Sequence, residues 1–86
     1  MAHRPTFGAH LKATRMQRGL TQEQLAQASG LHRTEISLLE HGKRTPLLET
    51  VVAIARALAL TPAEFLQDVS LPENWEHSRQ PRVPWF

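Results

Sequence analysis

The sequence predicts an all-α protein whose helices pack as one compact five-helix bundle. No segment of four to eight residues alternates between apolar and polar side chains, as a half-buried strand would. Helix start and stop signals recur along the chain instead. A length of 86 residues allows one domain with a modest core, and the 41% hydrophobic and 21% charged residues argue against a fully disordered chain.

The first helix is expected over residues 7–18. Gly19 can adopt the left-handed conformation that commonly follows the last residue of a helix. Phe7, Leu11 and Arg15 are spaced four residues apart and fall on one row of this helix. An arginine in line with two apolar side chains needs a partner.

The second helix is expected to begin after Thr21. This residue can serve as the N-cap, and Gln24 three positions later completes a capping box. Leu25 and Ala26 face inward, where the small Ala26 side chain permits a close crossing of two helices. Gly30 ends the helix and tolerates the positive φ of a tight turn.

The third helix is expected over residues 33–40 and is anchored on one side only. Leu31, Ile36 and Leu39 hold that side against the second helix. This is the layout of a helix-turn-helix, in which the second of two short helices enters the major groove of DNA. An ordinary helical hairpin is the alternative. The other side faces outward and carries His32, Arg33, Thr34, Ser37 and Leu38.

Two more helices follow Pro46, a fourth over residues 48–58 and a fifth starting at Thr61. Pro62 and Glu64 fit the first and third positions of a helix capped by Thr61. The fourth helix is unusually apolar for a small bundle, so it is either a central buried helix or part of a subunit interface. Within residues 47–60 only three side chains are polar: Glu49, Thr50 and Arg56.

The charge distribution favours a polyanionic partner although the net charge is only +2. Residues 57–78 contain four acidic residues and no lysine or arginine. A chain that is basic at one end and acidic at the other can present a basic face to a polyanion, although each single charge also fits a solvated surface. The basic residues that precede the first acidic residue, Glu23, are Arg4, Lys12, Arg15 and Arg18.

Several classes of protein are not expected. The absence of cysteine excludes disulfides and cysteine-based zinc sites, and the five histidines lack metal-ligand spacing. No catalytic triad motif or glycine-rich phosphate loop is present, so we expect no enzyme, metal or cofactor. No apolar run approaches the ~20 residues of a membrane span, and residues 1–8 lack the apolar core of a signal peptide. We therefore expect a cytoplasmic protein with no membrane partner.

The chain is predicted to divide into an N-terminal arm (1–6), a DNA-binding domain (7–68) and an extended C-terminal tail (69–86). Three prolines in the tail argue against a long helix. The tail is either disordered or, because its aromatic side chains are costly to leave in water, an arm that packs on its own domain or on a second subunit. The aromatic residues are Trp75, Trp85 and Phe86.

Residues 7–66 resemble the Xre or lambda-repressor-like family of helix-turn-helix transcriptional regulators. The matching text is GLTQEQLA (19–26), GLHRTEIS (30–37) and LEHGKRTP (39–46). The turn glycine, the Glu-x-Gly-Lys corner and the following proline stand at family spacing. The resemblance implies a five-helix bundle of this type that binds double-stranded operator DNA as a homodimer.

The resemblance also implies roles for particular residues. Arg33 is the strongest candidate for a base-reading residue, because a guanidinium can donate two hydrogen bonds to one guanine. An arginine of the first helix typically pairs with the glutamate that ends the third, here Arg15 with Glu40. The implied base-reading residues are Arg33, Thr34, Ser37 and Leu38. The implied contacts to the DNA backbone are Thr21, Gln22, His32, His41, Lys43 and Arg44.

Three positions depart from the family pattern. Leu38 stands where a polar or basic residue is more common, and it could contact a thymine methyl group or be a tolerated exposed leucine. His32 takes an N-cap position usually given to serine or threonine, so a weak cap is expected. Ala59 ends the fourth helix where glycine is common, which predicts a strained or differently built corner.

The sequence therefore predicts a small stand-alone transcriptional regulator, with the helix over residues 33–40 in the major groove. It would act as a symmetric dimer on a roughly palindromic site, using the apolar fourth helix and the tail as the dimer surface. The alternative is a protein-interaction module, such as an antitoxin or adaptor whose aromatic tail binds a partner protein.

Overall fold

The computed structural model describes residues 5–67 and 69, and within them the chain forms five α-helices and no strand, so the all-α prediction is confirmed. Each helix begins at the expected residue, and α1 to α4 end within one residue of the expected end. The helices are α1 (Phe7–Gln17), α2 (Gln22–Ser29), α3 (Arg33–Glu40), α4 (Leu48–Ala57) and α5 (Pro62–Leu66).

Side-chain caps at the starts of α1, α2 and α5 satisfy otherwise unpaired backbone N–H groups. In α2, the Thr21 hydroxyl accepts from the Gln24 N–H at 3.0 Å, and the Gln24 carbonyl oxygen accepts from the Thr21 N–H at 2.8 Å. Thr61 and Glu64 form the same reciprocal pair at the start of α5. His32 precedes α3 without any side-chain cap bond, as predicted.

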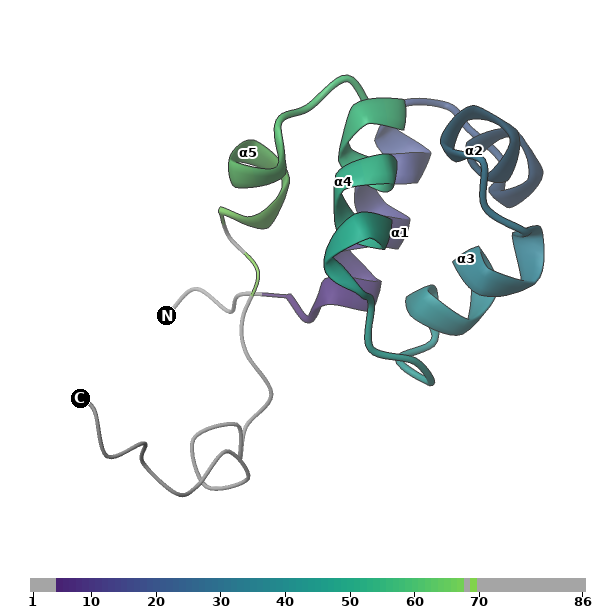
Figure 1. Ribbon diagram of the computed structural model, residues 1–86, viewed down its shortest axis with the longest axis horizontal. Helices are drawn as coiled ribbons and strands as arrows, with labels where there is room; N and C mark the ends of the chain where they lie inside the picture. The colour runs from purple at the N-terminus through teal and green to yellow at the C-terminus, as the bar shows by residue number, and fades with distance from the viewer. Residues whose placement is uncertain (1–4, 68, 70–86) are drawn as a thin grey trace.

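The helices pack around a core to which all five contribute. Helix α3 contacts α1 and α2, α2 also contacts α4, and α4 contacts α5. Figure 1 shows α5 and the α2–α3 pair on opposite sides of α4. The largest fully buried side chains are Leu11, Leu25, Ile36, Leu39, Ile54, Leu58 and Phe65.

Helix α4 is buried on one face only. Val51, Ile54 and Ala55 lie in the core, whereas Leu47 and Leu48 at the start of the helix are 69% and 75% exposed. A central buried helix therefore accounts for the apolar residues of the buried face but not for Leu47 and Leu48. The subunit-interface alternative stays a prediction.

A close backbone approach joins α1 to the end of α3. A methyl group on Gly8 would lie 2.4 Å from the carbonyl oxygen of Leu39 and 2.8 Å from that of Glu40. Only glycine leaves room for these carbonyls, because real Cβ contacts are never so short. The sequence gives no direct sign of this contact beyond a glycine placed inside a helix.

Two alternatives were expected for the corner between α4 and α5, strained or differently built, and the structure has a strained backbone there. Ala59 is the only non-glycine residue with positive φ in the described part of the chain, at 62°. The Leu60 N–H bonds to the Ala55 carbonyl at 2.8 Å, and Arg18 donates from Nε to the Leu58 carbonyl at 2.7 Å. These bonds hold the corner in the left-handed conformation, which costs an L-residue about 1–2 kcal/mol.

Substituting glycine for Ala59 is expected to raise the free energy of unfolding by up to ~1 kcal/mol. Glycine adopts positive φ without steric cost, and this gain exceeds its greater loss of backbone entropy on folding. Thermal unfolding should then shift upward by about 2–6 °C. A lower melting temperature would show that the corner is not strained.

The predicted arm, residues 1–6, and the predicted tail, residues 69–86, lie almost wholly outside the described residues. The same holds for the proposed packing of Trp75, Trp85 and Phe86. In the described part of the chain, no helix combines the length and apolar character needed to cross a bilayer.

Candidate nucleic-acid interface

The turn between α2 and α3 has the geometry of a helix-turn-helix. Gly30 caps α2 in the left-handed region at φ 80°. The N–H groups of Gly30 and Leu31 both bond to the carbonyl of Ala26, at 2.9 and 3.1 Å. Since Ala26 is buried and small, the two helices cross closely at this point.

Helix α3 has an inner face that fixes it and an outer face that carries the expected base-reading residues. Ile36 and Leu39 are fully buried. Arg33 and Thr34 are exposed, while Ser37 and Leu38 are each partly exposed. Leu38 is therefore not a fully solvent-facing leucine, and part of its surface packs against the domain.

Arg15 and Glu40, which the resemblance pairs, lie together between α1 and α3. Arg15 donates to Glu40 twice, from Nε at 2.6 Å and from Nη2 at 3.1 Å, and donates from Nη1 to the Leu20 carbonyl at 2.8 Å. The side chains of Arg15 and Glu40 are only 10% and 2% exposed. The hydrogen bonds to Glu40, and secondarily its charge, hold the pKa of Arg15 above its ordinary value despite burial.

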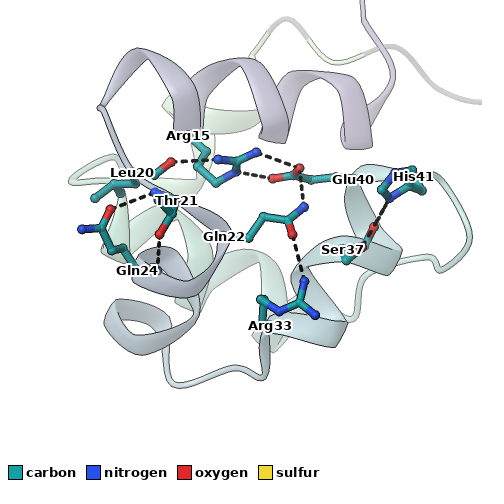
Figure 2. Close-up of polar contacts among 9 residues, drawn as sticks. All are labelled: Arg15, Leu20, Thr21, Gln22, Gln24, Arg33, Ser37, Glu40 and His41. Atoms are coloured by element: carbon teal, nitrogen blue, oxygen red, sulfur yellow. Dashed lines mark hydrogen bonds and ion pairs between the residues drawn. The ribbon is translucent and has the colours of Figure 1, made fainter.

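Gln22 connects this buried pair to the outer face of α3. Its Nε2 donates to Glu40 Oε1 at 3.1 Å, and its Oε1 accepts from Arg33 Nη1 at 3.3 Å. Figure 2 shows the Gln22 side chain between Glu40 and Arg33. We call Arg15, Glu40, Gln22 and Arg33 the polar network.

The loop after α3 holds the expected backbone contacts in defined positions. His41 Nδ1 lies 2.8 Å from the Ser37 carbonyl, which can only accept, so Nδ1 carries a proton and donates. The Lys43 N–H bonds to the Leu38 carbonyl at 2.9 Å. His41 and Lys43 are both exposed, so the Nε2 and Nζ groups can meet a ligand.

Arg44 is engaged within the domain. Its Nη1 donates to Glu35 Oε1, and the two side chains are 53% and 21% exposed. A phosphate contact by Arg44 would therefore compete with this ion pair. Of the other expected backbone contacts, Thr21 and His32 occupy the N-cap positions of α2 and α3 and are exposed.

Comparison with known proteins decides the family. A family model described as helix-turn-helix matches residues 11–65, more than half of the chain. The chain belongs to the helix-turn-helix family. Membership makes it a sequence-specific DNA-binding regulator of transcription of lambda-repressor-like type, in which α2 and α3 form the helix-turn-helix.

Individual relatives of this helix-turn-helix protein agree with that assignment. A transcriptional regulator of Sinorhizobium fredii, y4dJ, is 33% identical over 66 residues, which are 77% of this chain and 86% of the relative. The transcriptional regulator PuuR of Escherichia coli and the immunity repressor of Bacillus phage phi105 are longer, and the matched residues cover 36% and 46% of them.

Solved structures show the same fold. The controller protein C.AhdI of Aeromonas hydrophila is 39% identical, with a TM-score of 0.67 over 69% of this chain and 89% of that protein. The P22 c2 repressor, solved with a synthetic operator, is 25% identical, with a TM-score of 0.66 over 73% of this chain and 96% of the repressor.

Sequence reasoning missed three features of this helix-turn-helix domain. The first is the pair of bonds that Gln22 makes to Glu40 and Arg33. The second is the Glu35–Arg44 ion pair, and the third is the backbone contact at Gly8. None carries a local sequence signal, because each depends on how the helices pack or on the path of the loop after α3.

Proposed function

We propose that this regulator places α3 in the major groove of a specific double-stranded DNA site and contacts the flanking backbone with the start of α2 and the loop after α3. The observation that carries the proposal is the outer face of α3, where Arg33 and Thr34 are exposed while Ile36 and Leu39 lock the opposite face. The proposed base-reading residues are Arg33, Thr34, Ser37 and Leu38.

The proposed phosphate contacts surround this face. The N-terminus of α2 offers unpaired backbone N–H groups and a partial positive charge to a phosphate. Gln22 still has one amide N–H to donate, since its other N–H bonds to Glu40. The proposed backbone contacts are Thr21, Gln22, His32, His41, Lys43 and Arg44, the last after leaving Glu35. The protein would act in the cytoplasm, by binding and without catalysis.

A two-fold homodimer is part of the proposal. One helix-turn-helix unit meets few bases, whereas a dimer sets two recognition helices about 34 Å apart, one turn of DNA. The exposed Leu47 and Leu48 are available for such a contact, together with the tail. Light scattering at micromolar concentration tests this, and a monomer would contradict it.

Selection of bound sites from random duplexes tests the function as a whole. Arg33→Ala is then expected to cost about 1–3 kcal/mol on the selected site and to relax the preference at one base pair, because a bidentate contact is lost. Lys43→Ala should instead weaken binding to all sequences alike. It should also make the slope of log K against log salt concentration shallower by about one, because one phosphate contact is lost. If Arg33→Ala lowered the affinity for selected and for random DNA by the same factor, the base-reading role of Arg33 would be contradicted.

A further inference from the structure

We propose that His41 contacts the DNA backbone only as an imidazolium, so that each bound subunit takes up one proton and the affinity for DNA rises as the pH falls. This inference rests on the proposed function, in which His41 is a phosphate contact of the loop after α3. It adds a requirement on the protonation state of that contact, and with it a regulation of the same site by pH.

The bonds of the His41 ring fix which nitrogen carries the proton in the neutral form. Nδ1 lies 2.8 Å from the Ser37 carbonyl oxygen and 3.4 Å from the Ser37 hydroxyl, and Figure 2 shows the ring beside Ser37 at the end of α3. The carbonyl only accepts, so neutral His41 is protonated on Nδ1 and its Nε2 carries no hydrogen. Turning the ring over would bring Cδ2 to this carbonyl instead, closer than the roughly 3.3 Å of a weak C–H···O contact.

An Nε2 without a hydrogen cannot bond to a phosphate. The phosphate oxygens of DNA accept hydrogen bonds, and a deprotonated ring nitrogen is also an acceptor. Nε2 becomes a donor when the ring takes up a proton, and its bond to a phosphate is then charge-assisted. His41 is exposed to solvent, and a histidine side chain changes its charge between about pH 5 and pH 8.

His32, at the opposite end of α3, is not restricted in this way. It is exposed, and its side chain makes no capping bond that would hold the ring in one tautomer. Neutral His32 can therefore present an N–H group to a phosphate from either ring nitrogen. Both histidines are proposed backbone contacts, but only His41 has to be charged to make its contact.

The charged groups around His41 do not supply a partner for an imidazolium in the free protein. Glu40, the preceding residue, is 2% exposed and bonds to Arg15. Lys43 and Arg44 in the same loop are cationic, and they attract a phosphate. His41 also lines a surface hollow between α1 and this loop, to which α1 and the segments next to it and after α5 contribute only side chains that do not titrate: Thr6, Phe7, Gly8, Ala9 and Val69.

The phosphate therefore provides the opposite charge that favours the protonated ring. The complex then holds more protons than the free chain and free DNA do. By linkage, a lower pH shifts the equilibrium toward the state with more bound protons, so the affinity must rise as the pH falls.

The test measures the affinity of the full chain for the selected duplex at about pH 6 and pH 8, at one salt concentration. The wild-type chain should bind about three- to tenfold more tightly per subunit at the lower pH, because a charge-assisted bond is gained. His41→Gln cannot titrate and should lose most of this difference. His41→Arg keeps a permanent charge, so it should bind more tightly than the wild-type chain at the higher pH and show a flat profile. His32→Gln is the matched control and should keep the pH dependence.

Nitrogen NMR of the histidine rings tests the tautomer without DNA and without any variant. At about pH 8, the neutral form of His41 should be protonated on Nδ1, whereas His32 should be a mixture of tautomers. In the complex, both nitrogens of His41 should carry a hydrogen at the same pH. A neutral His41 ring in the complex would overturn the inference even if the variants fail to fold in thermal melts.

The outcomes separate this inference from the proposed function. If the wild-type chain binds no duplex at either pH, the proposed function is wrong and the inference falls with it. If it binds DNA equally well at both, the inference alone is overturned. Tighter binding at low pH for selected and random DNA alike supports a phosphate contact, which is independent of sequence. Weaker binding at low pH, or a dependence that is lost in His32→Gln but kept in His41→Gln, would overturn the inference.

Discussion

Replacing Glu40 with glutamine is expected to lower the free energy of unfolding by about 3–5 kcal/mol, since it strands the charge of a buried arginine. Arg15 is almost fully buried and directs its Nε and Nη2 groups at Glu40. An amide in that place keeps the size of the side chain but not its charge. Because a small domain holds only about 5 kcal/mol, Glu40→Gln should leave the protein close to unfolding at room temperature.

A double substitution that removes both buried charges shows whether Glu40→Gln destabilises through the unpaired charge or through a change in packing. Arg15→Met combined with Glu40→Leu should recover much of the lost stability, because a buried ion pair can be replaced by apolar side chains at little net cost. Glu35→Gln is the matched control. It breaks the more exposed pair with Arg44 and should cost no more than about 1 kcal/mol. If urea unfolding showed similar small decreases in the free energy of unfolding for Glu40→Gln and Glu35→Gln, a structural role for the buried pair would be contradicted.

Gly8→Ala is expected to destabilise the domain by about 2–3 kcal/mol, although alanine favours a helix. The new methyl group would lie 2.4 Å from the Leu39 carbonyl oxygen, which is backbone and cannot move aside alone. Separating α1 from α3 to relieve the overlap also stretches the bonds between Arg15 and Glu40. The cost of such overpacking exceeds the helix-propensity gain of about 1 kcal/mol.

Ala9→Gly provides the control for this prediction. Ala9 is exposed one position further along α1, so the reverse substitution there measures helix propensity without the steric contact. It should destabilise by up to about 1 kcal/mol. If Gly8→Ala were instead stabilising, α1 would have to lie further from α3 than the structure shows.

The helices could be predicted closely because their ends are encoded locally. Thr21 with Gln24, and Thr61 with Glu64, act through bonds between residues three apart, so the sequence alone reveals them. The corner at Ala59, whose φ is positive, was expected to be strained or differently built for another reason, because the family that the sequence resembles commonly has glycine there. The capping signals, by contrast, can be recognised without knowing the tertiary structure, because they involve only residues close in sequence.

The polar contacts between helices could not be predicted in this way. The position of Arg15 in line with two apolar residues indicated only that this arginine needs a partner. The assignment of Glu40 as that partner came from the resemblance to a family, not from spacing. Gln22 and Glu40 are 18 residues apart and meet only because α2 and α3 both pack close to the buried pair. The ion pair of Arg44 with Glu35 likewise depends on the path of the loop after α3.

The two faces of α3 have a consequence for engineering this protein. The side chains that hold the helix in the domain are Ile36, Leu39 and Glu40, whereas Thr34 and Ser37 on the outer face make no core contact. Substitutions at such outward positions usually change stability by less than about 0.5 kcal/mol. A library randomised at Thr34 and Ser37 can therefore be screened for new operator sequences in a scaffold that stays folded.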